Sequence, residues 1–166
     1  MIKIKPQTRD DIKYRVKWLN DPTVNKYIGD TIGQCTTLKK QEKWFDDYKK
    51  VKGKKFFTIY DNDKPIGWMG LSNINIANKN ADIFLAIGED EYRGKGYGKI
   101  ALLWLIDYAF KKLNLHKINL GVIENNIFAI KLYKSVGFEV EGKMKDEVWH
   151  DGIYYNFLSM ALFNNE

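Results

Sequence analysis

Cysteine and histidine are nearly absent from this sequence of 166 residues, which holds one Cys and two His. A single cysteine, Cys35, cannot form an internal disulfide, which favours a reducing compartment. With only His116 and His150 beside it, no zinc-ligand spacing exists, and we predict no bound metal. Because no histidine is near Cys35 in the sequence, we expect a small buried or half-buried residue rather than a nucleophile.

Long apolar runs are missing too. The longest covers residues 100–106, far short of the roughly 20 residues that span a bilayer. The N-terminal residues alternate apolar and charged side chains, without the apolar stretch of a signal peptide. We therefore expect a cytoplasmic protein with no membrane partner. Its length and its 45% apolar content fit one soluble globular domain, 1–166.

Arginine is scarce: of 27 basic residues only Arg9, Arg15 and Arg93 are arginines. A net charge of +6 could suit nucleic acid, but direct reading of base edges depends on arginine. We therefore expect no nucleic-acid partner. Most of the lysines are interpreted as a solvated surface, and a smaller share as groups that attract a polyanionic small molecule.

Apolar periodicity and turn residues give the order of elements. Period-two patterns predict strands at 2–5, 55–60, 65–74, 81–87 and 117–123, and two more within 138–163 around a turn at 150–152. Capping and period-3.6 patterns predict helices from Thr8 to the stop at 20–22, over 37–48, from 94–98 to about 113, and from Asn125 or Asn126 to Val136. The third helix is apolar nearly all round, so we expect it to be buried on most sides. The order indicates an α+β domain with a mixed, mostly antiparallel sheet of about seven strands and about four flanking helices.

The segment 93–98, Arg-Gly-Lys-Gly-Tyr-Gly, lies between a predicted strand and a helix. Its alternating glycines let a ligand approach the backbone, and the helix start supplies unpaired N–H groups and a positive dipole end. Such a site suits a diphosphate. It is not a P-loop, because the glycine spacing is one residue short and Ile100 replaces the hydroxyl that holds magnesium. Nor does it follow the spacing of a dinucleotide fingerprint.

The pattern R-x-x-G-x-G on Arg93, Gly96 and Gly98 resembles the pyrophosphate loop of the GNAT superfamily of acyl-CoA-dependent N-acetyltransferases. Residues 126–138 resemble its second signature, N-x-x-A-x-x-x-Y-x-x-x-G-F, and the order of elements over the whole chain is similar to that fold. Residues 18–22 and 140–154 resemble the Rim-type (ribosomal-protein N-terminal) and spermidine acetyltransferase branches.

This resemblance implies acetyl-CoA as cosubstrate and gives each matching residue a role. The strand ending at Ala86, Ile87 and Gly88 should diverge from its neighbour and pair with the pantetheine arm. Asn126 should contact the pantetheine, or cap its helix, and Tyr133 should be the general acid, worth typically 10²–10⁴-fold. The backbone N–H groups that should hold the pyrophosphate belong to Arg93, Gly94, Lys95, Gly96, Tyr97 and Gly98.

The general base is less clear. Some Rim-type enzymes carry a glutamate on the strand after the long helix, where this sequence has Gly121. The candidates are Asp82, Glu124, Glu141 and His150, each also readable as a surface group; Asp82 comes first because its strand runs toward the expected divergence.

The acceptor stays open among primary amines. An α-amine of pKa near 7.8 is roughly 14% neutral at pH 7, against roughly 0.04% for a lysine-like amine. A protein N-terminal α-amine is the leading interpretation, with a polyamine, a diamine or an amino sugar as alternatives. A non-catalytic acyl-CoA sensor is the alternative of another class. The apolar segment 153–163 could pair between subunits in a homodimer.

Overall fold

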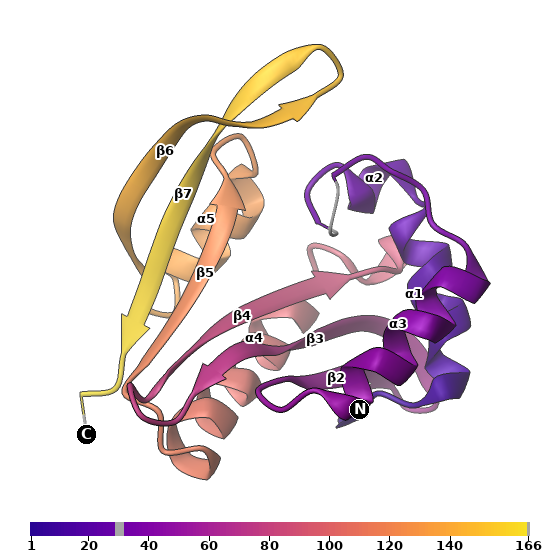
Figure 1. The fold of residues 1–166 in the computed structure, drawn as a ribbon, viewed down its shortest axis with the longest axis horizontal. Coiled ribbons are helices and arrows are strands. Elements are labelled where there is room, and N and C mark those ends of the chain that lie inside the picture. The colour runs from indigo at the N-terminus through magenta and orange to yellow at the C-terminus, as the bar shows by residue number, and fades with distance from the viewer. Residues whose placement is uncertain (29–31, 166) are drawn as a thin grey trace.

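Over residues 1–28 and 32–165, which the computed structural model describes, seven strands form one sheet in the order β1-β2-β3-β4-β5-β7-β6 (Figure 1). Neighbouring strands are antiparallel except β4 and β5, which run parallel. The strands are β1 Ile2–Pro6, β2 Lys55–Asp61, β3 Lys64–Asn75, β4 Asn80–Ile87, β5 Lys117–Ile123, β6 Glu139–His150 and β7 Ile153–Phe163. The predicted α+β fold with a mixed, mostly antiparallel sheet is confirmed.

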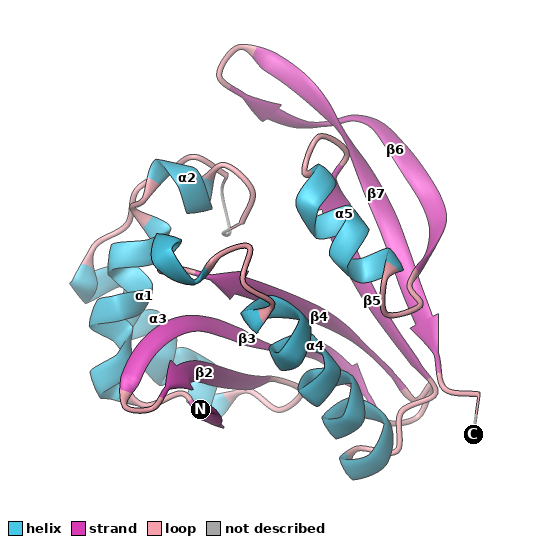
Figure 2. Ribbon diagram, turned by 180° about the vertical axis from the view of Figure 1, so that it is seen from behind, coloured by secondary structure: helices cyan, strands magenta, loops and turns pink. Residues whose placement is uncertain are grey.

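Helices cover both faces of the sheet (Figures 1 and 2). One face carries α1 Ile12–Leu19, α2 Pro22–Asn25 and α3 Leu38–Lys50, and the other carries α4 Tyr97–Asp107 and α5 Ile127–Lys134. Short 3-10 turns occur at Arg9–Asp11 and Asp90–Tyr92, and α4 continues into a π-helical turn, Tyr108–Lys112. Helix α2 is not predicted from the sequence, where Pro22 is expected only to end the preceding helix. Proline also suits the first position of a helix, where no N–H is needed, and here the Asp21 side chain caps it.

Three apolar clusters hold the layers together. The largest lies between the sheet and the α4–α5 face, and the others lie under α1 and α3. On the α1 side Trp18 stacks on Trp68 of β3, with ring centroids 5.4 Å apart and planes 5° from parallel. Both indoles are only 1% exposed, so this pair fixes α1 against the middle of the sheet.

The expectation that α4 is buried on most sides is wrong. Ala101, Leu102 and Leu105 are fully buried, whereas Ile100 is 54% and Leu103 49% exposed. The sheet covers only one side of this helix. Apolar residues all round a helix therefore do not predict burial on all sides, because a single layer can cover only one stripe of the helix.

Two other expectations also need correction. Cys35 is exposed, since it lies in the segment between α2 and α3 rather than in a packed element. The strand β7, expected at a subunit contact, lies between β5 and β6: residues 157–163 pair with β5, which leaves only residues 153–156 unpaired on that side. The edge strand at this end of the sheet is β6. None of the described helices has the length and apolar content needed to cross a membrane.

Candidate active site

The site is built around a gap in the middle of the sheet. Strands β4 and β5 pair only from Asn80 to Asp82 with residues 117–119, and then diverge. Strand β4 keeps its antiparallel pairing to β3 as far as Ile87, so it is β5 that leaves (Figure 1). The expected divergence is therefore present. Along residues 83–87 the edge of β4 that faces β5 is free to pair with an extended ligand.

The end of β4 is fixed by the Trp18 ring. A Cβ on Gly88 would lie 2.2 Å from Trp18 Cγ, so only glycine fits under the indole. Trp18 Nε1 donates to Glu89 Oε1 at 2.8 Å, and Lys17 Nζ donates to the same oxygen at 2.6 Å. Burial acts to raise the pKa of Glu89, but these two hydrogen bonds hold it below its usual value. The strand end is thus anchored by packing and by a charged contact.

The loop after β4 leads into the N-terminus of α4. Gly94 and Gly96 have φ of +70° and +86°, and a Cβ on either would meet no atom within 4 Å. The amides of Lys99 and Ile100 donate to Gly96 O, so the first hydrogen-bonded turn begins at Gly96. The amides before that turn have no intrahelical acceptor, and the positive end of the helix dipole lies beside them. This open, positively polarised backbone is suited to a diphosphate.

The Arg93 side chain is turned away from this loop and toward the end of β4. Its Nε donates to Ile87 O at 3.0 Å and its Nη2 donates to Gly88 O at 2.9 Å. Its Nη1 donates to Thr23 Oγ1 at 2.8 Å and to Asp90 Oδ1 at 3.2 Å. The Arg93 amide donates to Asp90 O at 3.0 Å. The expectation that the Arg93 amide holds the pyrophosphate therefore needs correction, and the candidate amides narrow to residues 94–98.

Arg93→Lys should destabilise the protein, although it keeps the positive charge of the side chain. A lysine cannot bridge two carbonyls, a hydroxyl and a carboxylate from one planar group. Hydrogen bonds to charged groups contribute about 1.5–3 kcal/mol each, and this side chain is 28% exposed, so we expect a loss of about 1–3 kcal/mol in unfolding free energy. Urea denaturation measures this loss. An unchanged midpoint would contradict the bracing role.

Tyr133 lies on α5 in the main core and is 8% exposed. Its ring packs near Phe138, with centroids 5.8 Å apart, and burial raises the pKa of its phenol to about 12. The phenol is therefore protonated at neutral pH. Asn126 caps the same helix, its Oδ1 accepting from the Ala129 amide at 3.3 Å. That contact occupies the carboxamide oxygen and leaves the nitrogen able to donate.

Asp82 lies where β4 and β5 last pair, in register with Asn119. Its Oδ2 accepts from Asn73 Nδ2 at 2.7 Å. Side chains alternate along a strand, and the neighbours Ala81 and Ile83 face the core cluster that contains Tyr133. Asp82 and Tyr133 therefore lie on opposite faces of the sheet.

The other base candidates are engaged elsewhere. Glu124 accepts from Lys143 and Asn156, which hold its pKa below the usual value. Glu141 pairs with Lys117 at 2.8 Å on the sheet edge, and His150 lies 3.2 Å from Asp151 in the β6–β7 hairpin. A Cβ on Gly121 would lie 2.1 Å from the Phe157 ring. An aromatic side chain thus fills the position at which a Rim-type glutamate would project.

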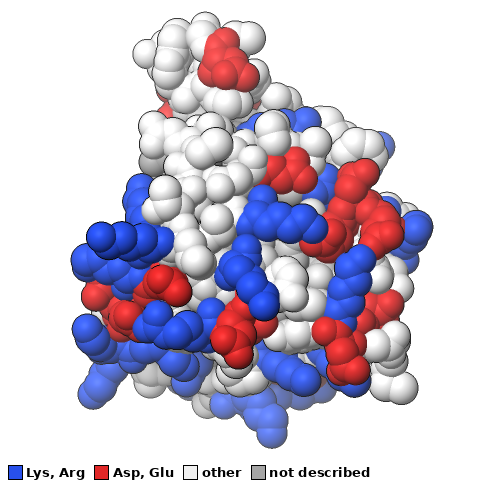
Figure 3. Space-filling view, turned by 90° about the vertical axis from the view of Figure 1, so that its right-hand side faces the viewer, with Lys and Arg blue, Asp and Glu red and all other residues white. Residues whose placement is uncertain are grey.

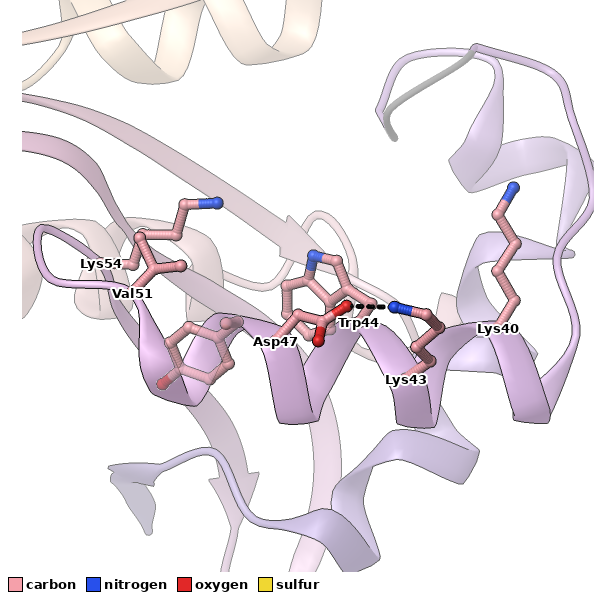
Figure 4. Close-up of a pocket in the computed structure, with 7 residues that line it drawn as sticks. Lys40, Lys43, Trp44, Asp47, Val51 and Lys54 are labelled. Carbon is pink, nitrogen blue, oxygen red and sulfur yellow. Dashed lines mark hydrogen bonds and ion pairs between the residues drawn. The ribbon is translucent and has the colours of Figure 1, made fainter.

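A separate hollow of about 270 Å³ is lined by α3 and by Val51 and Lys54, which follow it (Figure 4). The Lys43–Asp47 ion pair, at 2.6 Å, lies across it beside Trp44. Figure 3 shows Lys and Arg interspersed with Asp and Glu on one face of the molecule. Within the described residues, no group of three or more His, Cys, Asp or Glu is placed to hold a metal.

Comparison with known proteins decides the family. The sequence model of the acetyltransferase (GNAT) domain matches residues 4–158. The chain belongs to the GNAT acetyltransferase family. It is an acetyl-CoA-dependent N-acetyltransferase, as the two signatures predicted.

Several relatives of this GNAT enzyme have named activities. Spermidine N(1)-acetyltransferase of Escherichia coli (strain K12) is 28% identical over 165 residues, 99% of this chain and 87% of that protein. A putative ribosomal N-acetyltransferase, YdaF of Bacillus subtilis, is 28% identical over 123 residues, 74% of this chain and 66% of that protein. The structure of spermidine N-acetyltransferase from Vibrio cholerae in complex with CoA and spermine is similar with a TM-score of 0.90 and 26% identity, covering 98% of this chain and 95% of that one.

Proposed function

We propose that this N-acetyltransferase acetylates a primary amine of a polyamine of the spermidine class. The observation that carries the proposal is similarity to spermidine N-acetyltransferases over almost the whole chain, in sequence and in fold. These comparisons favour the polyamine alternative over the protein N-terminal α-amine that the sequence had placed first. Phe157 over Gly121 supports the same change, because the residue there is not the glutamate of some Rim-type enzymes.

The proposed reaction uses both faces of the gap. Acetyl-CoA lies with its diphosphate at residues 94–98 and its pantetheine arm paired to Ala86 and Ile87. The acceptor amine attacks the thioester carbonyl carbon from the Asp82 side, and Asp82 is the proposed group that takes its proton, directly or through water. The C–S bond then breaks, and the Tyr133 phenol supports the departing thiolate from the core side. Asn126 holds the pantetheine through its free carboxamide nitrogen.

An acceptor panel tests the proposal. We expect thiol release from acetyl-CoA with spermidine, and far slower release with Ala- or Ser-starting peptides and with an amino sugar. Turnover of the peptides alone would instead support the ribosomal-protein alternative that the YdaF similarity favours. No turnover on any amine would contradict the polyamine proposal and support the sensor interpretation.

The pH dependence should identify the acceptor independently. A polyamine amine with a lysine-like pKa of about 10.4 gains about tenfold in neutral fraction per pH unit from 6 to 9, so kcat/KM should rise with a slope near one. The pKa of Tyr133 is raised to about 12, so its phenol keeps its proton and no falling limb should appear below about pH 10. A plateau above about pH 8 would indicate an α-amine instead.

We also propose a cytoplasmic location and a homodimer. The lone, exposed Cys35 supports a reducing compartment. The outer edge of β6 supports self-association, because Val140 is 45% and Met144 38% exposed on that edge strand. Sedimentation velocity measures the oligomeric state.

A further inference from the structure

Phe128 is the most exposed of the large apolar side chains in the described residues, at 90%. It stands in the first turn of α5, two residues after the Asn126 cap. The signature that contains Asn126 and Tyr133 leaves this position free, so neither the family match nor the core explains an aromatic ring there. The apolar side chain of Phe128 is thus exposed to solvent in the folded protein.

The helix geometry shows which way the ring projects. Phe128 and Leu132 are four residues apart and share one face of α5. On that face Leu132 Cδ2 lies 3.5 Å from where a Cβ on Gly98 would stand. One helical turn rises about 5.4 Å, so Phe128 lies about one turn from the contact with the coenzyme loop.

The strand order shows on which side of that contact Phe128 lies. Strands β4 and β5 are parallel, so both carboxyl ends lie at the wide end of the gap. The coenzyme loop follows β4, and α5 follows β5 after three residues and returns toward the narrow end (Figure 2). Phe128 is thus on the wide side of the diphosphate site. The pantetheine arm, paired to Ala86 and Ile87, runs the other way.

We propose that Phe128 is the platform on which the adenine ring of acetyl-CoA stacks. The diphosphate joins two parts of the coenzyme, and the adenosine must continue on the side opposite the pantetheine. A Phe ring in the first turn of α5 offers a flat apolar surface there. Only two side-chain torsion angles set the position of this ring. Stacking between a base and an aromatic ring is tolerant of exact geometry and is a recurrent way to hold a base without enclosing it.

Binding to two coenzyme fragments separates this role from others. Isothermal titration would compare acetyl-CoA with S-acetyl-4′-phosphopantetheine, which lacks the adenosine. Phe128→Ala should weaken acetyl-CoA about tenfold and change the affinity for the adenosine-free compound by less than twofold. Phe128→Tyr should restore the affinity for acetyl-CoA. Ile127→Ala is the matched control, because Ile127 is also exposed in the same turn, at 51%, but lies about 100° further round the helix.

Three results would overturn the proposal. Unchanged affinity of Phe128→Ala for acetyl-CoA would leave the ring without a binding role. Equal weakening for both compounds would place it against the pantetheine. A loss of the same size in Ile127→Ala would indicate a general disturbance of the helix start. Thermal unfolding of each variant confirms that the fold is retained.

Discussion

Replacing Tyr133 with Phe should lower kcat by about 10²–10³-fold and leave the affinity for acetyl-CoA almost unchanged. The phenol is the candidate donor to the departing thiolate, and a single positioned donor of this kind is worth about that much. Burial raises its pKa to about 12, well above the 8.5 or so of an ordinary thiol. Full proton transfer is therefore uphill, and the donor acts mainly by a hydrogen bond, which sets the expected loss below the 10⁴ that general acids can reach.

Tyr133→Phe should retain the fold, because folding does not depend on the Tyr133 hydroxyl. Within the described chain the Tyr133 hydroxyl makes no hydrogen bond, so removing it leaves no partner unsatisfied. The matched control is Tyr48→Phe. Tyr48 is also 8% exposed, but it packs on α3 in a different cluster, so its variant should keep full activity. Equal rates for wild-type enzyme and Tyr133→Phe would remove the phenol from the mechanism.

Replacing both Gly94 and Gly96 with Ala should weaken acetyl-CoA binding by about 30- to 1000-fold. Both glycines have positive φ, and each left-handed non-glycine residue costs about 1–2 kcal/mol. A total of about 2–4 kcal/mol favours a relaxed loop whose amides no longer point at the diphosphate, and every 1.4 kcal/mol is tenfold in affinity. The added methyl groups meet no atom within 4 Å, so the change acts through backbone conformation rather than through a clash.

Gly152 supplies the control for this double variant. It too has a positive φ, +76°, and open space around its Cβ position, but it lies in the turn between β6 and β7. Gly152→Ala should therefore lower stability without touching coenzyme affinity. If the double Ala variant bound acetyl-CoA as tightly as the wild-type protein in isothermal titration, the glycine loop would not be the diphosphate site.

The order of elements could be read from the sequence because short-range chemistry sets it. Asn126 caps α5, Gly137 at φ +100° ends it, and polar turns separate β2, β3 and β4. These signals act over a few residues and do not need the rest of the fold. The glycine loop can be recognised for the same reason, since the function proposed for it depends on consecutive backbone groups.

What the sequence could not give depends on contacts between distant segments. The Arg93 side chain turns back to the carbonyls at the end of β4, and α2, seventy residues earlier, adds Thr23 as a further acceptor. The sequence allows Gly121 to be matched to a family position. It does not show that the Phe157 ring fills the space above this glycine. The exposed face of α4 likewise follows from which elements cover it. An arginine in a phosphate-loop motif thus proved to be a brace, which its spacing alone could not show.

Because β4 and β5 pair over only three residues, we expect the stability of this enzyme to depend on bound acetyl-CoA. A coenzyme bound as proposed, along the free edge of β4, would add contacts across the gap between β4 and β5. Ligand at a hundred times its dissociation constant adds about 2.7 kcal/mol to folding, which lowers the unfolded population about a hundredfold. Without bound acetyl-CoA the protein should therefore unfold more readily and be cleaved faster by added protease.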